Sequence, residues 1–351
     1  MTPRASKHII FRVSPNPRQL KENKMYLRSL RIFLAFAAGL LVLTAISFDT
    51  ISGQDASPTT AQQSQAQSNV DDQTYRLRVK VDLINVLCSV FDRNTNSFVT
   101  SLTRDDFSIY EDGQAQEIRN FARETDLPLT IAMLVDTSES VGPKLKFEQE
   151  AATSFFQSVL RENDRAMLVE FDSGVTMLQD FTGDANRMAK QIKQLRAAGG
   201  TALYDAIYTA CDEKLIRETG RKAIIILSDG EDRSSDRSFQ QAMEMALRAE
   251  STIFAISVSK GGFFGVGGSE EGDTVLKDMA RDTGGKVFFP FKIEELDDAF
   301  RQINQELRSQ YNIGFLSSNT KLDGKYRKLE IKVQEKAFRL NYRKGYYAPR
   351  S

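Results

Sequence analysis

Histidine is almost absent from this chain of 351 residues, which contains a single one, His8, near its start. Acid–base or triad catalysis that depends on histidine is therefore excluded from the rest of the sequence. The chain also lacks an excess of either charge, since Lys and Arg together number 47 and so do Asp and Glu. Nucleic-acid binding leaves a basic footprint, so we expect no nucleic-acid partner.

Cysteine is scarce as well, with only Cys88 and Cys211 in the whole sequence. Two cysteines do not form a disulfide framework, and they do not decide the cellular compartment. Cys88 falls in an apolar strand pattern and Cys211 in a helical pattern, in different predicted domains. We therefore expect two buried free thiols, with a disulfide between them as the alternative.

A charge-free apolar run stands out in the N-terminal region. Residues 32–46 carry no charge and follow Arg28 and Arg31, and no cysteine that could carry a lipid comes directly after them. This order is typical of a secretory signal and predicts a secreted, periplasmic or cell-envelope protein. The run is short for a bilayer span of about 20 residues. An uncleaved anchor through residues 32–46 stays open as the alternative, and any membrane contact is expected only there. Met1 and Met25 are alternative starts.

The composition changes along the chain and predicts five segments. Residues 1–52 form the signal peptide or anchor with its basic leader. Residues 53–74 are rich in Gln, Ser, Thr and Ala and predict a disordered linker, because they bury too little apolar surface to offset the entropy of ordering. Alternating patterns and an Asp-Gly turn predict a small β-sandwich-like unit at 75–126, and a C-terminal β unit at 311–351. The first β unit is small, so we expect it to pack on its neighbour or to borrow C-terminal strands. An α/β domain at 127–310 separates the two.

In this α/β domain, strand and helix patterns alternate. Apolar runs at 130–136 and 222–228 are typical of buried parallel strands, and 184–197 has the periodicity of an amphipathic helix. The alternation predicts a mostly parallel, doubly wound sheet with helices on both faces. The strands expected at 165–172 and 175–181 are too close for a crossover, which predicts a hairpin and one antiparallel edge strand.

Oxygen-bearing side chains follow the predicted strands in three separate pieces. The pieces are Asp136-Thr137-Ser138-Glu139-Ser140, Gly199-Gly200-Thr201 and Ser228-Asp229-Gly230. The loops that leave the carboxyl ends of strands in an open α/β sheet form its ligand crevice, so we expect the pieces to converge. Two carboxylates and three hydroxyls, without Cys or His, favour Mg²⁺, Mn²⁺ or Ca²⁺ over zinc or copper. The candidate metal ligands are Asp136, Ser138, Ser140, Thr201 and Asp229; helix capping by Asp136 or Ser140 is the alternative role.

This pattern of Asp-x-Ser-x-Ser, a distant Thr and a distant Asp resembles the metal-ion-dependent adhesion site of von Willebrand factor type A domains. All five positions are present, and the resemblance covers roughly residues 127–310. It implies that an Asp or Glu carboxylate of a protein partner completes the metal shell. The order of β unit, type A domain and β tail also resembles a group of secreted bacterial proteins, frequent in Acidobacteria, that carry a related version of the domain. Segments 107–121 and 343–347 carry that second likeness.

These features favour an exported binding or adhesion module that captures a protein partner through a divalent cation. A structural envelope subunit, whose metal site tunes assembly, is the main alternative. A metal-assisted hydrolase using Asp136 or Asp229 is disfavoured because no base or nucleophile pair stands out, so we predict no enzyme. The stretch 260–269 lacks the spacing of a phosphate-binding loop and predicts a mobile loop, in which Phe263 and Phe264 are candidate ligand contacts.

Overall fold

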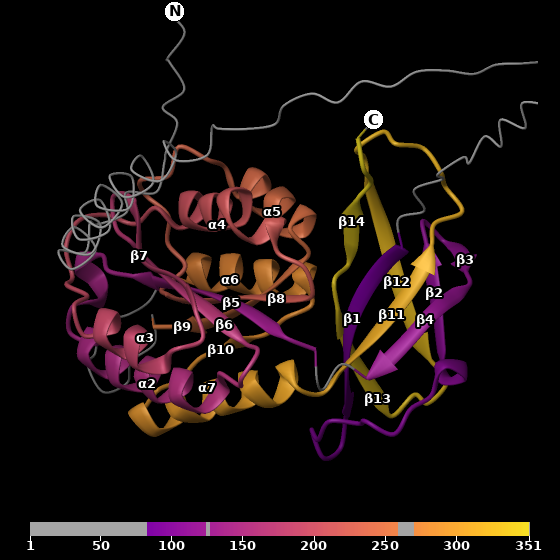
Figure 1. Cartoon of the computed structure of the whole chain (residues 1–351), viewed down its shortest axis with the longest axis horizontal. Helices are drawn as coiled ribbons and strands as arrows, with labels where there is room; N and C mark the ends of the chain where they lie inside the picture. The colour runs from indigo at the N-terminus through magenta and orange to yellow at the C-terminus, as the bar shows by residue number, and fades with distance from the viewer. Residues whose placement is uncertain (1–82, 124–126, 259–269, 351) are drawn as a thin grey trace, which may run out of the picture. The chain divides into compact units, whose positions relative to one another are not determined.

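The computed structural model describes residues 83–123, 127–258 and 270–350 (Figure 1). The predicted signal or anchor, the linker and the glycine-rich stretch at 260–269 lie outside these residues. Within the described ranges, no helix is long and apolar enough to cross a membrane.

A six-stranded sheet forms the centre of the α/β domain, in the order β10-β9-β8-β5-β6-β7. All neighbours pair in parallel except β6 and β7, which form an antiparallel hairpin. The predicted mostly parallel sheet with one antiparallel edge strand is thus confirmed. Its strands are β5 (Leu129–Asp136), β6 (Arg165–Phe171), β7 (Val175–Thr182), β8 (Arg221–Ser228), β9 (Ser251–Ser257) and β10 (Val287–Phe288).

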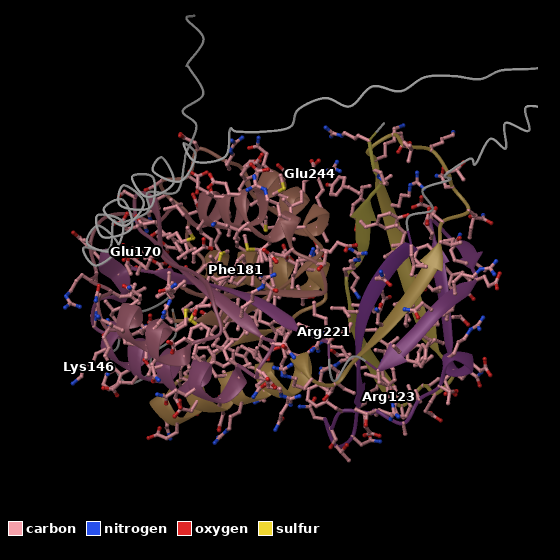
Figure 2. All side chains as sticks on the ribbon, viewed as in Figure 1. Arg123, Lys146, Glu170, Phe181, Arg221 and Glu244 are labelled. Atoms are coloured by element: carbon pink, nitrogen blue, oxygen red, sulfur yellow. The ribbon has the colours of Figure 1, made fainter. Side chains whose placement is uncertain are left out.

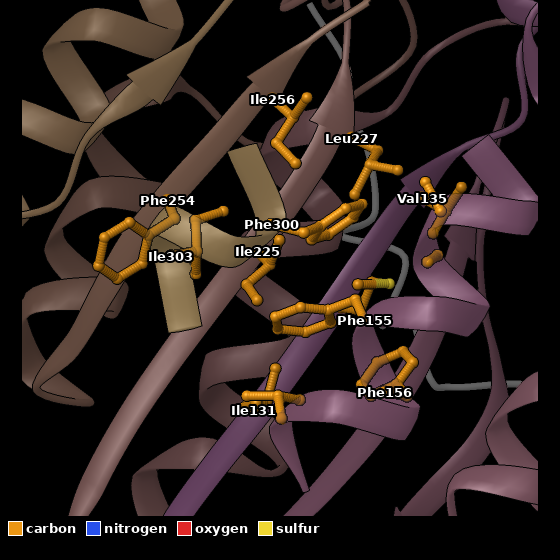
Figure 3. Packing of buried hydrophobic residues seen from close by; sticks show 14 of the residues in the cluster. Ile131, Val135, Phe155, Phe156, Ile225, Leu227, Phe254, Ile256, Phe300 and Ile303 are labelled. Atoms are coloured by element: carbon orange, nitrogen blue, oxygen red, sulfur yellow. The ribbon is translucent and has the colours of Figure 1, made fainter. Parts of the chain in front are cut away.

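Helices cover this sheet on both faces, as the uninterrupted apolar strands require. Every residue of β5, β8 and β9 is buried, because strands between two helical layers have no solvent side. Figure 3 shows the core of one face, where the rings of Phe155 and Phe300 stack with their centroids 4.7 Å apart. This face packs against α2 (Leu145–Val159), α3 (Ala185–Ile192) and α7 (Ile293–Leu307), and the other against α4 (Leu203–Glu213), α5 (Phe239–Arg248) and α6 (Glu270–Thr283).

The helix predicted over 184–197 is shorter than expected. It begins at Ala185, and the carboxylate of the N-cap residue Asp184 accepts hydrogen bonds from the backbone N–H groups of the first turn. It ends at Ile192, although Leu195 remains buried. The chain then turns away from the helix, because Ala198 N donates to the carbonyl oxygen of Thr137 at 2.7 Å in the loop after β5. Contact with a neighbouring loop therefore overrides the helical periodicity.

The remaining strands form two four-stranded antiparallel sheets that share one core. Their orders are β13-β1-β11-β4 and β14-β12-β2-β3. β1 (Leu83–Asp92), β2 (Phe107–Glu111), β3 (Gln114–Gln116) and β4 (Ile118–Arg123) precede the α/β domain, whereas β11 (Gln310–Leu316), β12 (Tyr326–Val333), β13 (Phe338–Tyr342) and β14 (Gly345–Tyr347) follow it. Each sheet combines strands from both segments, since β1 pairs with β11 and β13, and β2 pairs with β12. The N-terminal and C-terminal β segments thus build one sandwich, and the α/β domain is inserted between them.

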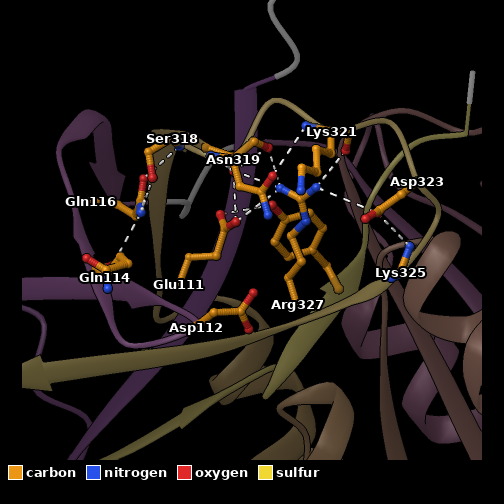
Figure 4. A network of polar contacts seen from close by, with 12 residues as sticks. Glu111, Asp112, Gln114, Gln116, Ser318, Asn319, Lys321, Asp323, Lys325 and Arg327 are labelled. Carbon is orange, nitrogen blue, oxygen red and sulfur yellow. Dashed lines mark hydrogen bonds and ion pairs between the residues drawn. The ribbon is translucent and has the colours of Figure 1, made fainter.

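A buried ion pair joins the two segments inside this sandwich (Figure 4). Arg327 of β12 donates to the carboxylate of Glu111 of β2 at 3.2 Å, and both side chains are buried. Glu111 also accepts hydrogen bonds from the hydroxyls of Ser317 and Tyr346, at 2.8 and 3.0 Å, while Arg327 also donates to the carbonyl oxygen of Lys321 at 2.6 Å. Buried charges are tolerated when they have this many partners.

Arg221, the first residue of β8, lies where the inserted domain joins the sandwich (Figure 2). It is buried, and its guanidinium donates to the carbonyl oxygens of Leu127, just before β5, and of Leu307, the last residue of α7. One side chain therefore holds the beginning and the end of the inserted domain.

The two cysteines are free and buried, as predicted. Burial raises the pKa of both the Cys88 and the Cys211 thiol well above the ordinary range. Neither thiol is thus a ready nucleophile.

Candidate metal centre

The three predicted pieces lie at one edge of the central sheet. Asp136 is the last residue of β5, and Asp229 directly follows β8. These strands pair in parallel with Val135 opposite Leu227, so the residues that follow leave the sheet side by side. Thr201 lies two residues before α4, in the loop that follows α3.

A chain of hydrogen bonds joins four of the five candidate ligands. Ser138 N donates to Asp136 Oδ1 at 2.9 Å, and the Oγ atoms of Ser138 and Ser140 lie 3.0 Å apart. Ser140 Oγ in turn donates to Asp229 Oδ2 at 3.0 Å. Two carboxylates and two hydroxyls are therefore within reach of one another and form a set of hard oxygen donors.

Thr201 belongs to the same region through its loop. Its side chain is buried, and in the described part of the chain no hydrogen bond joins its hydroxyl to the other four candidates. Its carbonyl oxygen accepts from Arg233 N and Ser234 N, each at 2.9 Å, in the loop after β8. Glu139 N also donates to the carbonyl oxygen of Gly199 at 3.4 Å. The loop of Thr201 is thus tied to both neighbouring loops.

The two glycines before Thr201 allow this close approach. Gly199 has a φ of +77°, which side chains rarely adopt. A Cβ atom on Gly200 would lie 2.5 Å from Ser234 Oγ. Gly199 thus lies in a left-handed turn, and a side chain at position 200 would require the Ser234 hydroxyl to move.

Ser228 is a functional candidate that the ligand pattern alone did not indicate. Its Oγ donates to Asp136 Oδ2 at 2.7 Å and accepts from Gly230 N at 3.1 Å. Both carboxylate oxygens of Asp136 are hence hydrogen-bonded, which fixes the orientation of the group. The signal in the sequence is its position at the end of an apolar strand, directly before Asp229.

The electrostatics of Asp136 favour a cation nearby. Burial raises the pKa of Asp136 to about 6, hydrogen bonds from Ser138 and Ser228 oppose the rise, and the charge of Asp229 adds to it. The side chain is 0% exposed. A carboxylate that water does not solvate gains more from a positive ion than a surface carboxylate does.

Two charged residues outside the predicted set lie close to these carboxylates. Lys144 stands just before α2, and its ammonium group donates to the carbonyl oxygen of Val258, directly after β9. Glu148 lies one turn later, is 2% exposed, and neither of its carboxylate oxygens has a hydrogen-bond partner in the described residues. Burial raises the pKa of Glu148 to about 8; Asp136 raises it further, Lys144 opposes the rise, and Asp229 adds to it.

Helix capping does not account for these side chains. The short 3-10 helix η2 (Glu139–Val141) begins after Ser138, and α2 begins after Lys144, without a side-chain capping hydrogen bond in either case. Asp136 Oδ1 accepts from the backbone of Ser138, and Ser140 donates to a carboxylate on another loop. Neither of the two proposed caps therefore serves as one.

The loop after β8 is held by carboxylates of its own. Asp205 of α4 accepts hydrogen bonds from the backbone of Asp236 and Arg237, at 3.0 and 2.9 Å. Asp232 accepts from Tyr204 N at 2.9 Å and from Ser235 Oγ at 2.6 Å. These bonds fix the path of the chain between Asp229 and α5, so that Asp229 sits on a well-supported loop.

The donor set fits a hard divalent cation better than a softer one. The buried carboxylate of Asp136 and the half-buried carboxylate of Asp229 supply the negative charge, and the two carboxyl oxygens of Glu148 have no hydrogen-bond partner among the described residues. In the ranges that the structure describes, no group of three or more Asp, Glu, His or Cys side chains could hold a metal ion. A set of two carboxylates with neighbouring hydroxyls suits Mg²⁺, Mn²⁺ or Ca²⁺.

Comparison with known proteins adds a sequence match. Residues 131–231 match the profile of the von Willebrand factor type A domain. An uncharacterized protein from Borreliella burgdorferi is 25% identical over 224 residues, which cover 59% of this chain. The aligned region spans 62% of the length of that curated relative.

Two solved structures show a distant likeness. A von Willebrand factor type A protein from Catenulispora acidiphila aligns at 13% identity with a TM-score of 0.45, over 70% of this chain and 74% of that chain. The vWF domain of the type V pili tip protein Mfa5 from Porphyromonas gingivalis aligns at 16% identity with a TM-score of 0.41, over 51% of this chain and 94% of that chain. The assignment of the domain rests on the profile match and on the order of the strands in the sheet, and it does not depend on these two structures. The chain contains a von Willebrand factor type A domain.

Proposed function

We propose that this protein is a binding module that captures a protein partner through a divalent cation. The ligands would be Asp136, Ser138, Ser140, Thr201 and Asp229, with the two Asp side chains bound directly or through water. The observation that carries the proposal is the hydrogen-bonded chain from Asp136 through the two serines to Asp229, at the carboxyl ends of β5 and β8.

The chemistry of the five proposed ligands explains why a cation held by them would bind a group from outside the protein. Hydroxyls coordinate a cation without cancelling its charge, and Mg²⁺ keeps part of its water shell in protein sites. An Asp or Glu carboxylate of a partner can replace one of these waters and supply the missing negative charge. A contact of this kind, shielded from solvent, would act as a hot spot in an interface of modest size.

Binding is favoured over catalysis by the groups that surround the site. The sequence offers no histidine beyond His8, and both cysteines are buried. The ammonium group of Lys144 is engaged with the carbonyl oxygen of Val258. The hydroxyls that donate to carboxylates here, Ser140 to Asp229 and Ser228 to Asp136, belong to the proposed metal site, which we therefore assign to binding and not to hydrolysis.

The proposal includes export from the cytoplasm. It rests on the basic residues Arg28 and Arg31 followed by the charge-free run at 32–46. Fractionation of the native host should find the protein in the envelope or the medium. A cytoplasmic protein with an intact N-terminus would contradict export and leave the metal site untouched.

Calorimetric titration with Mg²⁺, Mn²⁺ and Ca²⁺ tests the cation. Wild type should bind, and the double variant Asp136→Ala, Asp229→Ala should not. The matched control removes two exposed carboxylates elsewhere, Asp212→Ala with Asp297→Ala, and should bind like wild type. Equal binding by the site variant and wild type would refute the ligand assignment.

A pull-down from envelope extract tests the partner. Wild type with Mg²⁺ should retain a partner that chelator and Thr201→Ala both release, with the fold of the variant checked by circular dichroism. Self-association of the purified chain on adding Mg²⁺, without a retained partner, would instead favour the structural envelope subunit. A partner retained equally in all conditions would exclude the metal site as the contact.

A further inference from the structure

We propose that Glu148 is a further acidic group of the metal site, which balances the charge of the bound cation from the protein interior without coordinating it. This inference rests on the proposed function, because it requires a cation at Asp136 and Asp229. It concerns a residue outside the five predicted ligands.

The first argument is the burial of a carboxyl group without partners. Glu148 is 2% exposed, and neither Oε1 nor Oε2 accepts or donates a hydrogen bond within the described residues. Burying such a group unpaired is costly. The neighbouring inward positions of α2 are apolar, among them Leu145, Ala152 and Phe155. A leucine or methionine would satisfy the fold at position 148, so the fold alone does not explain an acid there.

The second argument is the balance of charge around Glu148. The charged groups that influence it are Asp136, Lys144 and Asp229. The ammonium group of Lys144 donates to the carbonyl oxygen of Val258 and forms no ion pair with Glu148. With all three carboxylates ionised, as they would be beside a bound cation, the single ammonium group leaves two negative charges in a largely buried region. A divalent cation supplies the charge that cancels them.

The proton balance follows from the same arrangement. Because burial raises the pKa of Glu148 to about 8, the group carries a proton near neutral pH when no cation is present. A cation at Asp136 and Asp229 favours the ionised form, so its arrival releases that proton to solvent. The affinity for Mg²⁺ should therefore rise as the pH rises through about 8, beyond any contribution of Asp136, whose pKa is about 6.

The experiment compares Glu148→Gln with Glu150→Gln in the full chain. Both changes remove one negative charge from α2, but Glu150 is exposed. Titration with Mg²⁺ at pH 8.5 should show Glu148→Gln binding about tenfold more weakly than wild type, with Glu150→Gln unchanged. At pH 6.5 the loss should be smaller, because wild-type Glu148 is then protonated. In chelator, Glu148→Gln should melt at the same temperature as wild type or higher.

Each outcome decides between a role at the metal site and a structural role. Equal affinities of wild type and Glu148→Gln at pH 8.5 would overturn the inference, as would a lower melting temperature in chelator without a change in affinity. If Glu148→Gln does not fold, Glu148→Met is measured in its place. Failure of both to fold would show that the fold needs the acid, and would also overturn the inference. If neither wild type nor Asp136→Ala binds Mg²⁺, the proposed function itself fails.

Discussion

Asp136 is the residue on which the candidate site is built, since both of its carboxylate oxygens are held by serines. We predict that Ser228→Ala weakens Mg²⁺ binding several-fold, because Asp136 Oδ2 loses the donor that orients it at 2.7 Å. Stability should fall by only about 1 kcal/mol, the value of one hydrogen bond. Calorimetric titration and thermal melting measure the two effects. Ser158→Ala, on α2, is the matched control, since its hydroxyl bonds only within its own helix. Unchanged affinity in Ser228→Ala would contradict a supporting role.

Single residues also govern how stability depends on pH. The pKa values of Asp136 and Glu148 in the folded chain, about 6 and about 8, lie above their usual values of 3.8 and 4.5. The folded state therefore holds these protons more tightly than the unfolded state. Their stabilising effect is complete below about pH 4 and is lost as the pH rises through about 6 and then about 8.

We accordingly predict that the melting temperature of the chelated protein falls between pH 5 and pH 8.5. Saturating Mg²⁺ should flatten this decline, because the cation stabilises the ionised carboxylates. Glu148→Gln in chelator should show a shallower decline than wild type. A flat profile for the chelated wild type would mean that neither carboxyl group is protonated in the folded chain.

The sequence predicts that the candidate ligands lie together, but it does not predict the residues that surround them. Asp136, Ser138 and Asp229 follow apolar strands, so topology alone brings them to one edge of the sheet. Glu148 gives no such signal, because a Glu on an amphipathic helix usually faces solvent. Its inward position becomes visible only through its spacing of three from Leu145 and four from Ala152, which are both buried.

At the scale of elements, the buried pair of Glu111 and Arg327 connects strands that lie on opposite sides of the inserted domain in sequence. We predict that Arg327→Met destabilises the sandwich by about 3–5 kcal/mol, because Glu111 would be left as a buried charge without its cation. Urea unfolding monitored by tyrosine fluorescence measures the loss. Lys328→Met, at the next and exposed position of β12, should cost little. Similar losses for both variants would indicate that strand propensity, and not the ion pair, is responsible.

Periodicity predicts which segments become strands, but it does not predict their partners. Buried and exposed residues alternate along β12, as they do in a half-buried strand, and β1 shows this alternation in part of its length. Their partners β11 and β2 lie more than 200 residues away in the chain, as in the pairing of Leu83 with Leu316. No local signal encodes a pairing over that distance. The short end of the predicted helix at 184–197 has a similar cause, since a tertiary contact of Ala198 ends it.

At the scale of the whole molecule, the two folded parts differ in how they depend on the C-terminus. All six strands of the type A sheet lie between Leu129 and Phe288, whereas the sandwich needs β11–β14. We predict that a chain ending at residue 309 keeps the type A domain folded but loses the order of residues 83–123. Limited proteolysis should cut first within 83–123, and should leave 129–307 intact. The full chain, treated in parallel, should resist cleavage at 83–123. Early cuts within 129–307 of the shortened chain would contradict this independence.

The hydrogen bonds from Arg221 to the carbonyl oxygens of Leu127 and Leu307 have a mechanical consequence. A load applied to the type A domain reaches the sandwich along the two connections, one before β5 and one after α7. Because one guanidinium holds both connections at the first residue of β8, they bear the load in parallel. The two connections lead to neighbouring strands of one sheet, since β4 and β11 pair antiparallel with Arg123 opposite Tyr311. A pull on the inserted domain should therefore load β4 and β11 together and not one after the other.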